Sequence, residues 1–153
     1  MRKFQTGAAT VEIAIVSLTF IWLMLAIVEV GRGMYTWNAL TEATRLGSRA
    51  ASVCQIQDNV ISQIATFNGN DLLGGLKEDN ISVNYLDANG AVVANPNPAN
   101  ELGFLQVRYV QVTIQNYQYD LLIPGLNKVT LPAFSTTVPR QSFGIVPNEA
   151  PGC

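Results

Sequence analysis

The residue whose type and position most clearly suggest a chemical role is Glu12. It lies five residues after Gly7, at the start of a long apolar segment. Between residues 8 and 28 no other side chain is ionisable. A carboxylate in an apolar medium is costly unless water or a positive partner is within reach. From the residues alone, Glu12 is interpreted as an interfacial residue with access to water at a helix start, where an anion also suits the helix dipole.

The two cysteines, Cys54 and Cys153, are the other residues whose type suggests covalent chemistry. A disulfide between them would join the region after the apolar segment to the last residue. It would close a loop of about 100 residues and contribute up to about 4 to 5 kcal/mol in the chain-entropy account. Two free thiols, or pairing between subunits, are the alternatives. With no histidine in the chain, a zinc site would need carboxylate ligands, so we expect neither a metal site nor a cofactor.

Catalytic motifs are missing from the sequence. The chain has no histidine, the commonest general base near neutral pH, and no phosphate-binding loop or nucleophile elbow. Its carboxylates after residue 70 lie mostly beside turn residues, and an anchored hydrolase would need two of them to converge in a pocket. Nine Lys and Arg residues and a net charge of -2 provide no basic patch. We therefore expect no enzyme, no small-molecule substrate and no nucleic-acid partner.

The apolar segment itself predicts a membrane anchor. Residues 8–28 approach the roughly 20 apolar residues that cross a bilayer core as a helix. Arg2 and Lys3 precede the segment, and positive flanks are retained in the cytoplasm, so the rest of the chain is expected outside. A cleaved secretory signal is the alternative, but the segment ends at Val28 and Glu29 without small residues of the Ala-x-Ala kind. About 100 residues follow, near the size of one small domain.

Helical periodicity continues beyond the apolar segment. Small side chains recur at every fourth residue and are interrupted by one aromatic residue: Gly31, Tyr35, Ala39, Ala43, Gly47 and Ala51. Such a stripe allows close helix packing, either on a neighbouring helix or, in the outer half, on this chain's own sheet. The helix is expected to run to about Ser52 and to measure roughly 65 to 70 Å. Glu29 and Arg32 are three residues apart and are interpreted as membrane-boundary anchors, with assembly contacts as a second role.

The remainder of the chain predicts an α+β head. A short helix is indicated over residues 60–67, with Asp58 as its cap and Asn68-Gly69 as its stop. Alternation predicts a strand at residues 81–85, a turn at 87–90 and a return strand at 91–94. A long strand over 105–114 with a bulge near Tyr109 and a last strand over 129–138 complete the expected antiparallel sheet. Pro132 requires an edge or irregular position in that last strand, and Pro124-Gly125 marks a turn.

These motifs together resemble the TadE family, pilin-like proteins of the bacterial tight-adherence (Tad, or Flp) pilus system. The resemblance rests on Gly-Ala-Ala-x-Val-Glu at residues 7–12, Val-Glu-Val-Gly-Arg at 28–32, the segment 38–50, and Tyr-Asp-Leu-Leu-Ile-Pro-Gly-Leu at 119–126. It is strong over residues 6–51 and looser over 52–153. The resemblance implies a minor pilin or pseudopilin with a long N-terminal pilin-like helix and an exported head.

The resemblance also implies a set of partners and a processing event. A membrane prepilin peptidase would cut between Gly7 and Ala8, so that residues 1–7 are a leader, 8–52 the transmembrane and projecting helix, and 53–153 the head. Glycine before the cut lets a protease approach the backbone closely. Glu12 would then meet the N-terminal ammonium of a neighbouring pilin subunit. The expected location is the bacterial cytoplasmic membrane, and the pilus or cell surface after assembly by Tad-type machinery. An uncleaved, membrane-anchored binding or scaffold subunit is the alternative.

Overall fold

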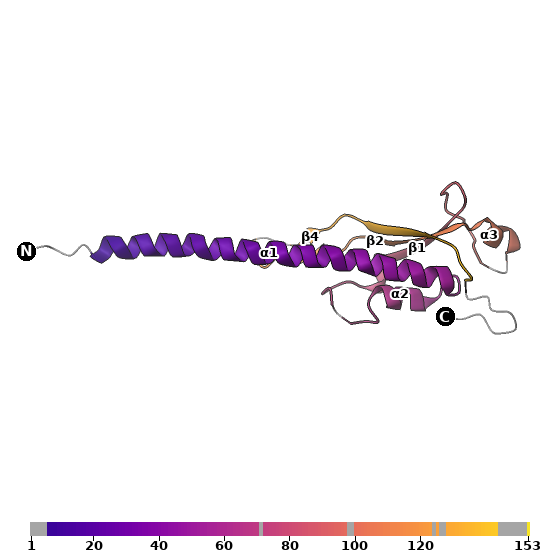
Figure 1. Cartoon of the computed structure of the whole chain (residues 1–153), viewed down its shortest axis with the longest axis horizontal. Coiled ribbons are helices and arrows are strands. Elements are labelled where there is room, and N and C mark those ends of the chain that lie inside the picture. Colours follow the sequence, from indigo (N-terminus) through magenta and orange to yellow (C-terminus); the bar gives the residue numbers. More distant parts are fainter. Residues whose placement is uncertain (1–5, 71, 98–99, 124, 126–127, 144–152) are drawn as a thin grey trace, which may run out of the picture.

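The structure, a computed structural model, describes residues 6–70, 72–97, 100–123, 125, 128–143 and 153. The basic leader residues Arg2 and Lys3 and the expected turn residue Pro124 lie outside these residues. The described chain is a long N-terminal helix, α1 (Thr6–Val53), with a small α+β head along its outer half (Figure 1). The predicted α+β class and the long helix are confirmed.

The two halves of α1 differ in what surrounds them. The N-terminal half projects alone (Figure 1), and the large apolar side chains from Val11 to Val28 are mostly exposed. Among the described residues, α1 is the one helix long and apolar enough to cross a membrane. The C-terminal half is different, since Leu40, Ala43 and Ala51 are fully buried against the head. The helix passes through Gly31 and Gly33 without a break.

The described part of the head is built on a three-stranded antiparallel sheet in the order β1-β2-β5. Its strands are β1 (Ile81–Leu86), β2 (Tyr109–Ile114) and β5 (Phe134–Pro139). In the central strand Val112 pairs with Val83 of β1 and Thr136 of β5. Alternate residues of β2 are completely buried while those between them are not, as expected for a strand with one face on the core.

Two layers enclose the outer half of α1. The helix contacts β2 and β5 on one side and α2 (Asn59–Ala65) on another, and Figure 1 shows it between the sheet and α2. Gly47 makes this arrangement possible, because a Cβ there would lie 2.9 Å from Ala65 Cβ and 3.2 Å from Val112 Cγ1. Both distances are shorter than ordinary contact, so the absence of a side chain brings three elements together.

Two small strands extend the head toward the bare half of α1. They are β3 (Gln118–Tyr119) and β4 (Val129–Thr130), which pair with each other, Tyr119 opposite Val129. A buried cluster of Leu40, Ile114, Tyr117, Tyr119 and Phe134 joins this end of the head to the helix. A separate cluster around Ala51, Cys54, Ile61 and Phe143 fills the distal end. The head therefore has one core on the side of the candidate membrane span, called here the membrane-proximal core, and a distal core.

Several local predictions are confirmed by the structure. Asp58 is the N-cap of α2, where its side chain accepts a hydrogen bond of 3.0 Å from the Val60 amide. Beyond α2, Asn68 and Gly69 have positive φ angles of 57° and 73°, the left-handed backbone expected of a helix stop. The strand expected at 81–85 is β1. Pro132 lies in an irregular segment, which divides the expected strand over 129–138 into β4 and β5.

The prediction of a long strand over 105–114 is wrong. Its first part is a short helix, α3 (Glu101–Gln106), and β2 begins only at Tyr109. Long-range contacts override the local alternation, because the Arg140 guanidinium donates to the carbonyls of Phe104 and Val107 at 3.0 and 3.2 Å. These bonds satisfy backbone acceptors where α3 ends. The expected return strand over 91–94 is also reduced to a single bridge between Leu86 and Val92.

Candidate functional site

The polar junction between the head and α1 begins at Glu29, at the end of the apolar segment. Glu29 is only 8% exposed, and its Oε2 accepts hydrogen bonds from the Leu122 amide at 3.1 Å and from Arg32 Nη1 at 3.2 Å. The first contact joins residues 93 positions apart. A helix side chain thus serves as the acceptor for a backbone amide of the head, which satisfies that donor where the apolar segment ends.

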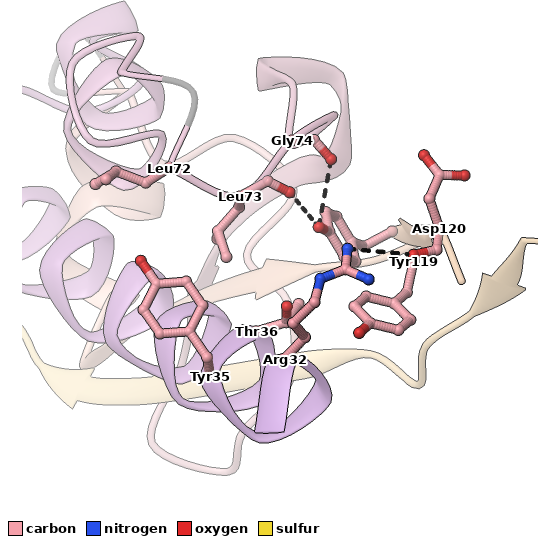
Figure 2. A pocket seen from close by; sticks show the side chains of 9 residues that line it. Arg32, Tyr35, Thr36, Leu72, Leu73, Gly74, Tyr119 and Asp120 are labelled. Atoms are coloured by element: carbon pink, nitrogen blue, oxygen red, sulfur yellow. Dashed lines mark hydrogen bonds between the residues drawn. The ribbon is translucent and has the colours of Figure 1, made fainter. Parts of the chain in front are cut away.

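Arg32 extends this junction from the helix to the segment after β3. Its Nη2 donates to the Asp120 carbonyl at 3.4 Å, and its guanidinium carbon lies 5.4 Å from the centre of the Tyr119 ring. Figure 2 shows the Arg32 side chain rising from α1 toward Tyr119 and Asp120. The predicted i to i+3 pair of Glu29 and Arg32 is present, but both side chains also hold the head, which a helical pair alone does not explain.

Tyr119 supplies the neutral part of the junction. Burial raises the pKa of its phenol above the ordinary value, and the nearby Glu29 carboxylate raises it further because it disfavours a second negative charge. Among the described residues, neither the Tyr119 hydroxyl nor Glu29 Oε1 has a partner that meets hydrogen-bond geometry. The two groups therefore act on each other at longer range.

A cavity of about 250 Å³ lies beside this junction. It is lined by residues of α1, of the 72–74 segment and of the β3 region (Figure 2): Arg32, Tyr35, Thr36, Leu72, Leu73, Gly74, Tyr117, Tyr119 and Asp120. The Tyr117 hydroxyl donates to the carbonyls of Leu73 and Gly74, so it ties the 72–74 segment to the strand region. The polar contacts around the cavity thus join parts of the chain, an arrangement suited to positioning the head on the helix.

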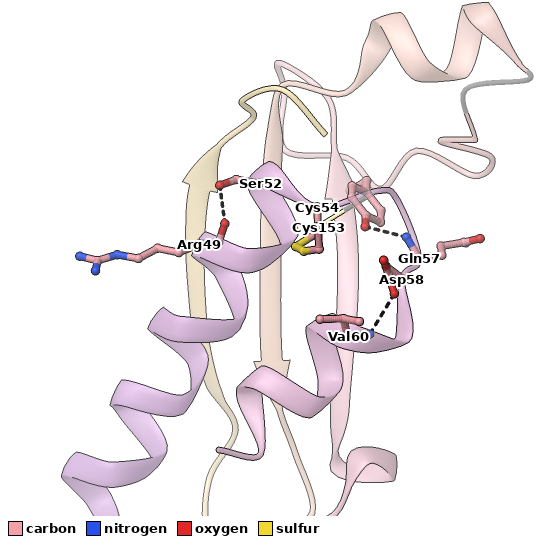
Figure 3. The surroundings of a disulfide bond; sticks show 8 residues. Arg49, Ser52, Cys54, Gln57, Asp58, Val60 and Cys153 are labelled. Carbon is pink, nitrogen blue, oxygen red and sulfur yellow. Dashed lines mark hydrogen bonds between the residues drawn. A yellow bond between two sulfur atoms is a disulfide. The ribbon is translucent and has the colours of Figure 1, made fainter. Parts of the chain in front are cut away.

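The distal end of the head carries the second predicted site. Cys54 follows α1 directly and is bonded to Cys153, with the two Cα atoms 4.6 Å apart and a sequence separation of 99 residues (Figure 3). Cys54 is 1% exposed. The Ser52 carbonyl also accepts hydrogen bonds from the amides of Gln141 and Phe143 at 3.2 and 3.4 Å. The end of α1 is thus joined to the C-terminal part of the chain by a covalent bond and by backbone contacts.

The remaining candidate residues lie along α1. Gly7, Ala8 and Glu12 are exposed on its first turns, in the half that projects from the head. In the small-residue stripe, Gly31 is exposed, Ala39 is partly buried, and Ala43 and Gly47 are buried against the head. The outer part of the stripe therefore packs within this chain, and its inner part does not.

Sequence reasoning missed the head residues that meet Glu29 and Arg32. Tyr119, Asp120 and Leu122 were recognised as part of a family-like motif at 119–126, without a role. A signal was present, since a carboxylate and a guanidinium at the end of an apolar segment call for partners. Nothing local identified which backbone groups, 88 and 93 residues away, supply them.

The fold and this junction define an α+β protein whose N-terminal helix is a candidate membrane anchor for a small head. Residues 7–49 match the family model described as TadE-like protein, which confirms the predicted resemblance over that segment. The match is consistent with a pilin-type protein of the Tad pilus system and covers most of α1. No curated protein and no solved structure matches the chain.

Proposed function

We propose that this chain is a minor pilin or pseudopilin that takes part in assembly of a Tad (Flp) pilus. The observation that carries the proposal is the bare half of α1. Its most apolar 18-residue window has none of its residues buried within the chain, although large apolar surfaces are normally covered. Lipid before assembly, and neighbouring pilin helices afterwards, would cover it. The family match over residues 7–49 supports the same conclusion.

Processing between Gly7 and Ala8 is part of this proposal. The bond lies in the first turn of α1, which begins at Thr6. Amides of a first turn have no intrahelical acceptor, so this turn can unwind into a peptidase at low cost. Neither a described side chain nor the backbone beyond neighbouring residues lies within 4 Å of a Cβ placed on Gly7. A prepilin peptidase would therefore find the site uncovered by the head.

Cleavage would give Glu12 its proposed partner. Removal of residues 1–7 leaves an ammonium on Ala8, about one helical turn from Glu12. In an assembly of parallel helices, the carboxylate of one subunit and the ammonium of its neighbour would relieve each other's charge in an apolar interior. Glu12 is exposed and lies far from the described head contacts, which leaves it free for such an intersubunit role.

The proposed location is the bacterial cytoplasmic membrane, crossed once, with the N-terminus in the cytoplasm and the head outside. The leader charges Arg2 and Lys3 favour this orientation, and an oxidising exterior favours the Cys54–Cys153 bond. After assembly the head would reach the pilus or cell surface. The partners would be other pilin subunits, Tad-type assembly machinery, the prepilin peptidase and lipid.

The proposed division is leader 1–7, helix 8–52 and head 53–153. The head is nevertheless built around the helix, because Leu40 and Ala43 of α1 belong to its membrane-proximal core. The outer part of α1 is therefore both a projecting helix and a component of the head. The head and helix would enter an assembly as one rigid unit.

Replacement of Glu12 by alanine tests the function. We expect normal membrane insertion but at least about a tenfold loss from the sheared surface fraction, because every 1.4 kcal/mol of lost pairing is tenfold in association. Glu42→Ala is the matched control, since Glu42 is an exposed carboxylate of the same helix, 3.6 Å from Arg45. Equal surface amounts of the Glu12→Ala and Glu42→Ala variants would contradict the proposed assembly role.

A further inference from the structure

The segment 120–123, which follows β3, lies at the level where the apolar part of α1 ends. The Leu122 amide donates to Glu29 Oε2 at 3.1 Å, so the Leu122 backbone lies within one side-chain length of residue 29 on α1. In Figure 1 the head's inner end, marked by β4, overlies the middle of α1. The hydrogen bond therefore fixes the height of this segment relative to the candidate membrane span.

That height coincides with the expected edge of the bilayer core. Residues 8–28 rise by about 1.5 Å each and so extend about 30 Å, the thickness of the hydrocarbon region. Glu29 then lies at the outer boundary of the hydrocarbon. Leu122, hydrogen-bonded to Glu29, lies beside α1 at the same boundary.

The Leu122 side chain is apolar and 54% exposed at this position. On α1, Val30 and Met34, which follow Glu29 in the chain, are also apolar and are 63% and 64% exposed. Leu121, in contrast, packs against the membrane-proximal core. The head therefore has an exposed apolar side chain, Leu122, at the level where the exposed apolar part of α1 ends.

Polar groups follow directly on the strand side of this segment. Asp120 Oδ1 lies 3.3 Å from Lys128 Nζ, and both side chains are more than half exposed. An apolar side chain next to an exposed ion pair is the arrangement expected at a lipid–water boundary, where the aliphatic group meets acyl chains and the charges remain among headgroups and water.

We propose that Leu122 is a second membrane contact of this protein, inserted at the headgroup–acyl boundary of the outer leaflet. The contact rests on the proposed membrane anchoring of α1. It fixes the rotation and tilt of the head on the bilayer before assembly, because the head then touches lipid at α1 and, beside it, at Leu122. Glu29 positions the contact by holding the Leu122 backbone.

Nitroxide labels on the full-length chain test the contact in vesicles of phosphatidylethanolamine and phosphatidylglycerol. Single cysteines at Leu122, Val92 and Ile21 would be labelled without reductant, so that the native disulfide stays closed. Val92 is the matched control, an apolar residue 63% exposed that pairs with Leu86. Ile21 reports whether α1 enters lipid at all.

Collision with oxygen, which concentrates in lipid, is compared with collision with a water-soluble nickel chelate. We expect the ratio of oxygen to nickel collisions to be highest at residue 21, several-fold lower at 122 and lowest at 92. A ratio at 122 equal to that at 92, with 21 in lipid, would overturn the Leu122 contact and leave the anchor standing. A water-like ratio at 21 would overturn both the anchor and the contact.

Discussion

The two ends of the head are joined to the same helix in different ways. At the distal end, the buried Cys54 is bonded to Cys153 just after α1. At the membrane-proximal end, Glu29 and Arg32 hold the head through hydrogen bonds to backbone groups. The distal connection is covalent and depends on oxidising conditions, whereas the proximal one is reversible and depends on charge and hydration.

This difference indicates a division of roles. A bond that closes a long loop acts chiefly on the unfolded chain, so the distal connection governs whether the head folds. A hydrogen bond at an edge has a small net effect on global stability but determines local order. The proximal connection therefore governs how the folded head is held on the helix next to the candidate membrane span.

The largest expected effect comes from removing the disulfide. Cys153→Ala should lower the free energy of unfolding by about 4 kcal/mol, because the bond closes a loop with a sequence separation of 99 residues. Denaturant unfolding of the full chain in detergent measures the loss. The double variant Cys54→Ala with Cys153→Ala should differ from the single variant only by the packing of one small buried side chain. An unchanged midpoint on reduction of the native chain would show that the bond does not form.

Breaking the proximal junction should have a smaller and local effect. Glu29→Ala removes the acceptor of the Leu122 amide and the partner of Arg32. We expect a local loss of about 2 kcal/mol, equivalent to roughly 30-fold faster hydrogen exchange at the Leu122 amide. Exchange near Cys54 should not change. Glu42→Ala, in an exposed ion pair, is the control and should cost less than about 0.5 kcal/mol.

Gly47 tests the packing that lies between the two connections. Gly47→Ala should destabilise the head by about 1 to 2 kcal/mol, since the new Cβ would lie 2.9 Å from Ala65 Cβ. Gly33→Ala is the matched control on the same helix, because a Cβ there meets no atom within 4 Å. It should be neutral or stabilising by up to about 1 kcal/mol. Thermal unfolding measures both variants. Equal shifts in their melting temperatures would contradict this packing.

Tyrosine ionisation has the smallest expected effect on stability at neutral pH. It reports on both ends of the head. Burial raises the pKa of Tyr85 at the distal end and of Tyr119 at the proximal end. A raised pKa favours the neutral phenol in the folded state, so its contribution is complete below about pH 10 and is lost as the pH rises through the folded-state value. Absorbance of tyrosinate should show late steps that Tyr85→Phe and Tyr119→Phe remove one at a time. Ionisation of both residues at the ordinary value would contradict their burial.

The sequence predicted those parts of the fold that depend on local patterns. The span and length of α1 follow from apolar composition and helical periodicity, and the start of α2 follows from Asp58 as a cap. Helix α3 was not predicted, because the local alternation of apolar residues resembles that of a strand. The helix end is stabilised instead by Arg140, which donates to the carbonyls of Phe104 and Val107, about 35 positions away. Local sequence does not encode such contacts.

The candidate site divides in the same way. Glu29, Arg32 and the cysteines were recognised by residue type and position. Their relation to the head was not, because the donor for Glu29 is the backbone amide of Leu122, which any residue other than proline could supply. A hydrogen-bond donor of the backbone therefore cannot be predicted from the types of the side chains. Only the folded arrangement of β3 beside α1 reveals it.

Mass spectrometry and N-terminal sequencing of the protein from membrane and sheared-surface fractions test the central claim most directly. Each fraction would be alkylated with and without prior reduction. The pilin account predicts a surface form that begins at Ala8 and whose two thiols react only after reduction. A chain that keeps Met1 and remains confined to the membrane would contradict it and favour an uncleaved, anchored subunit.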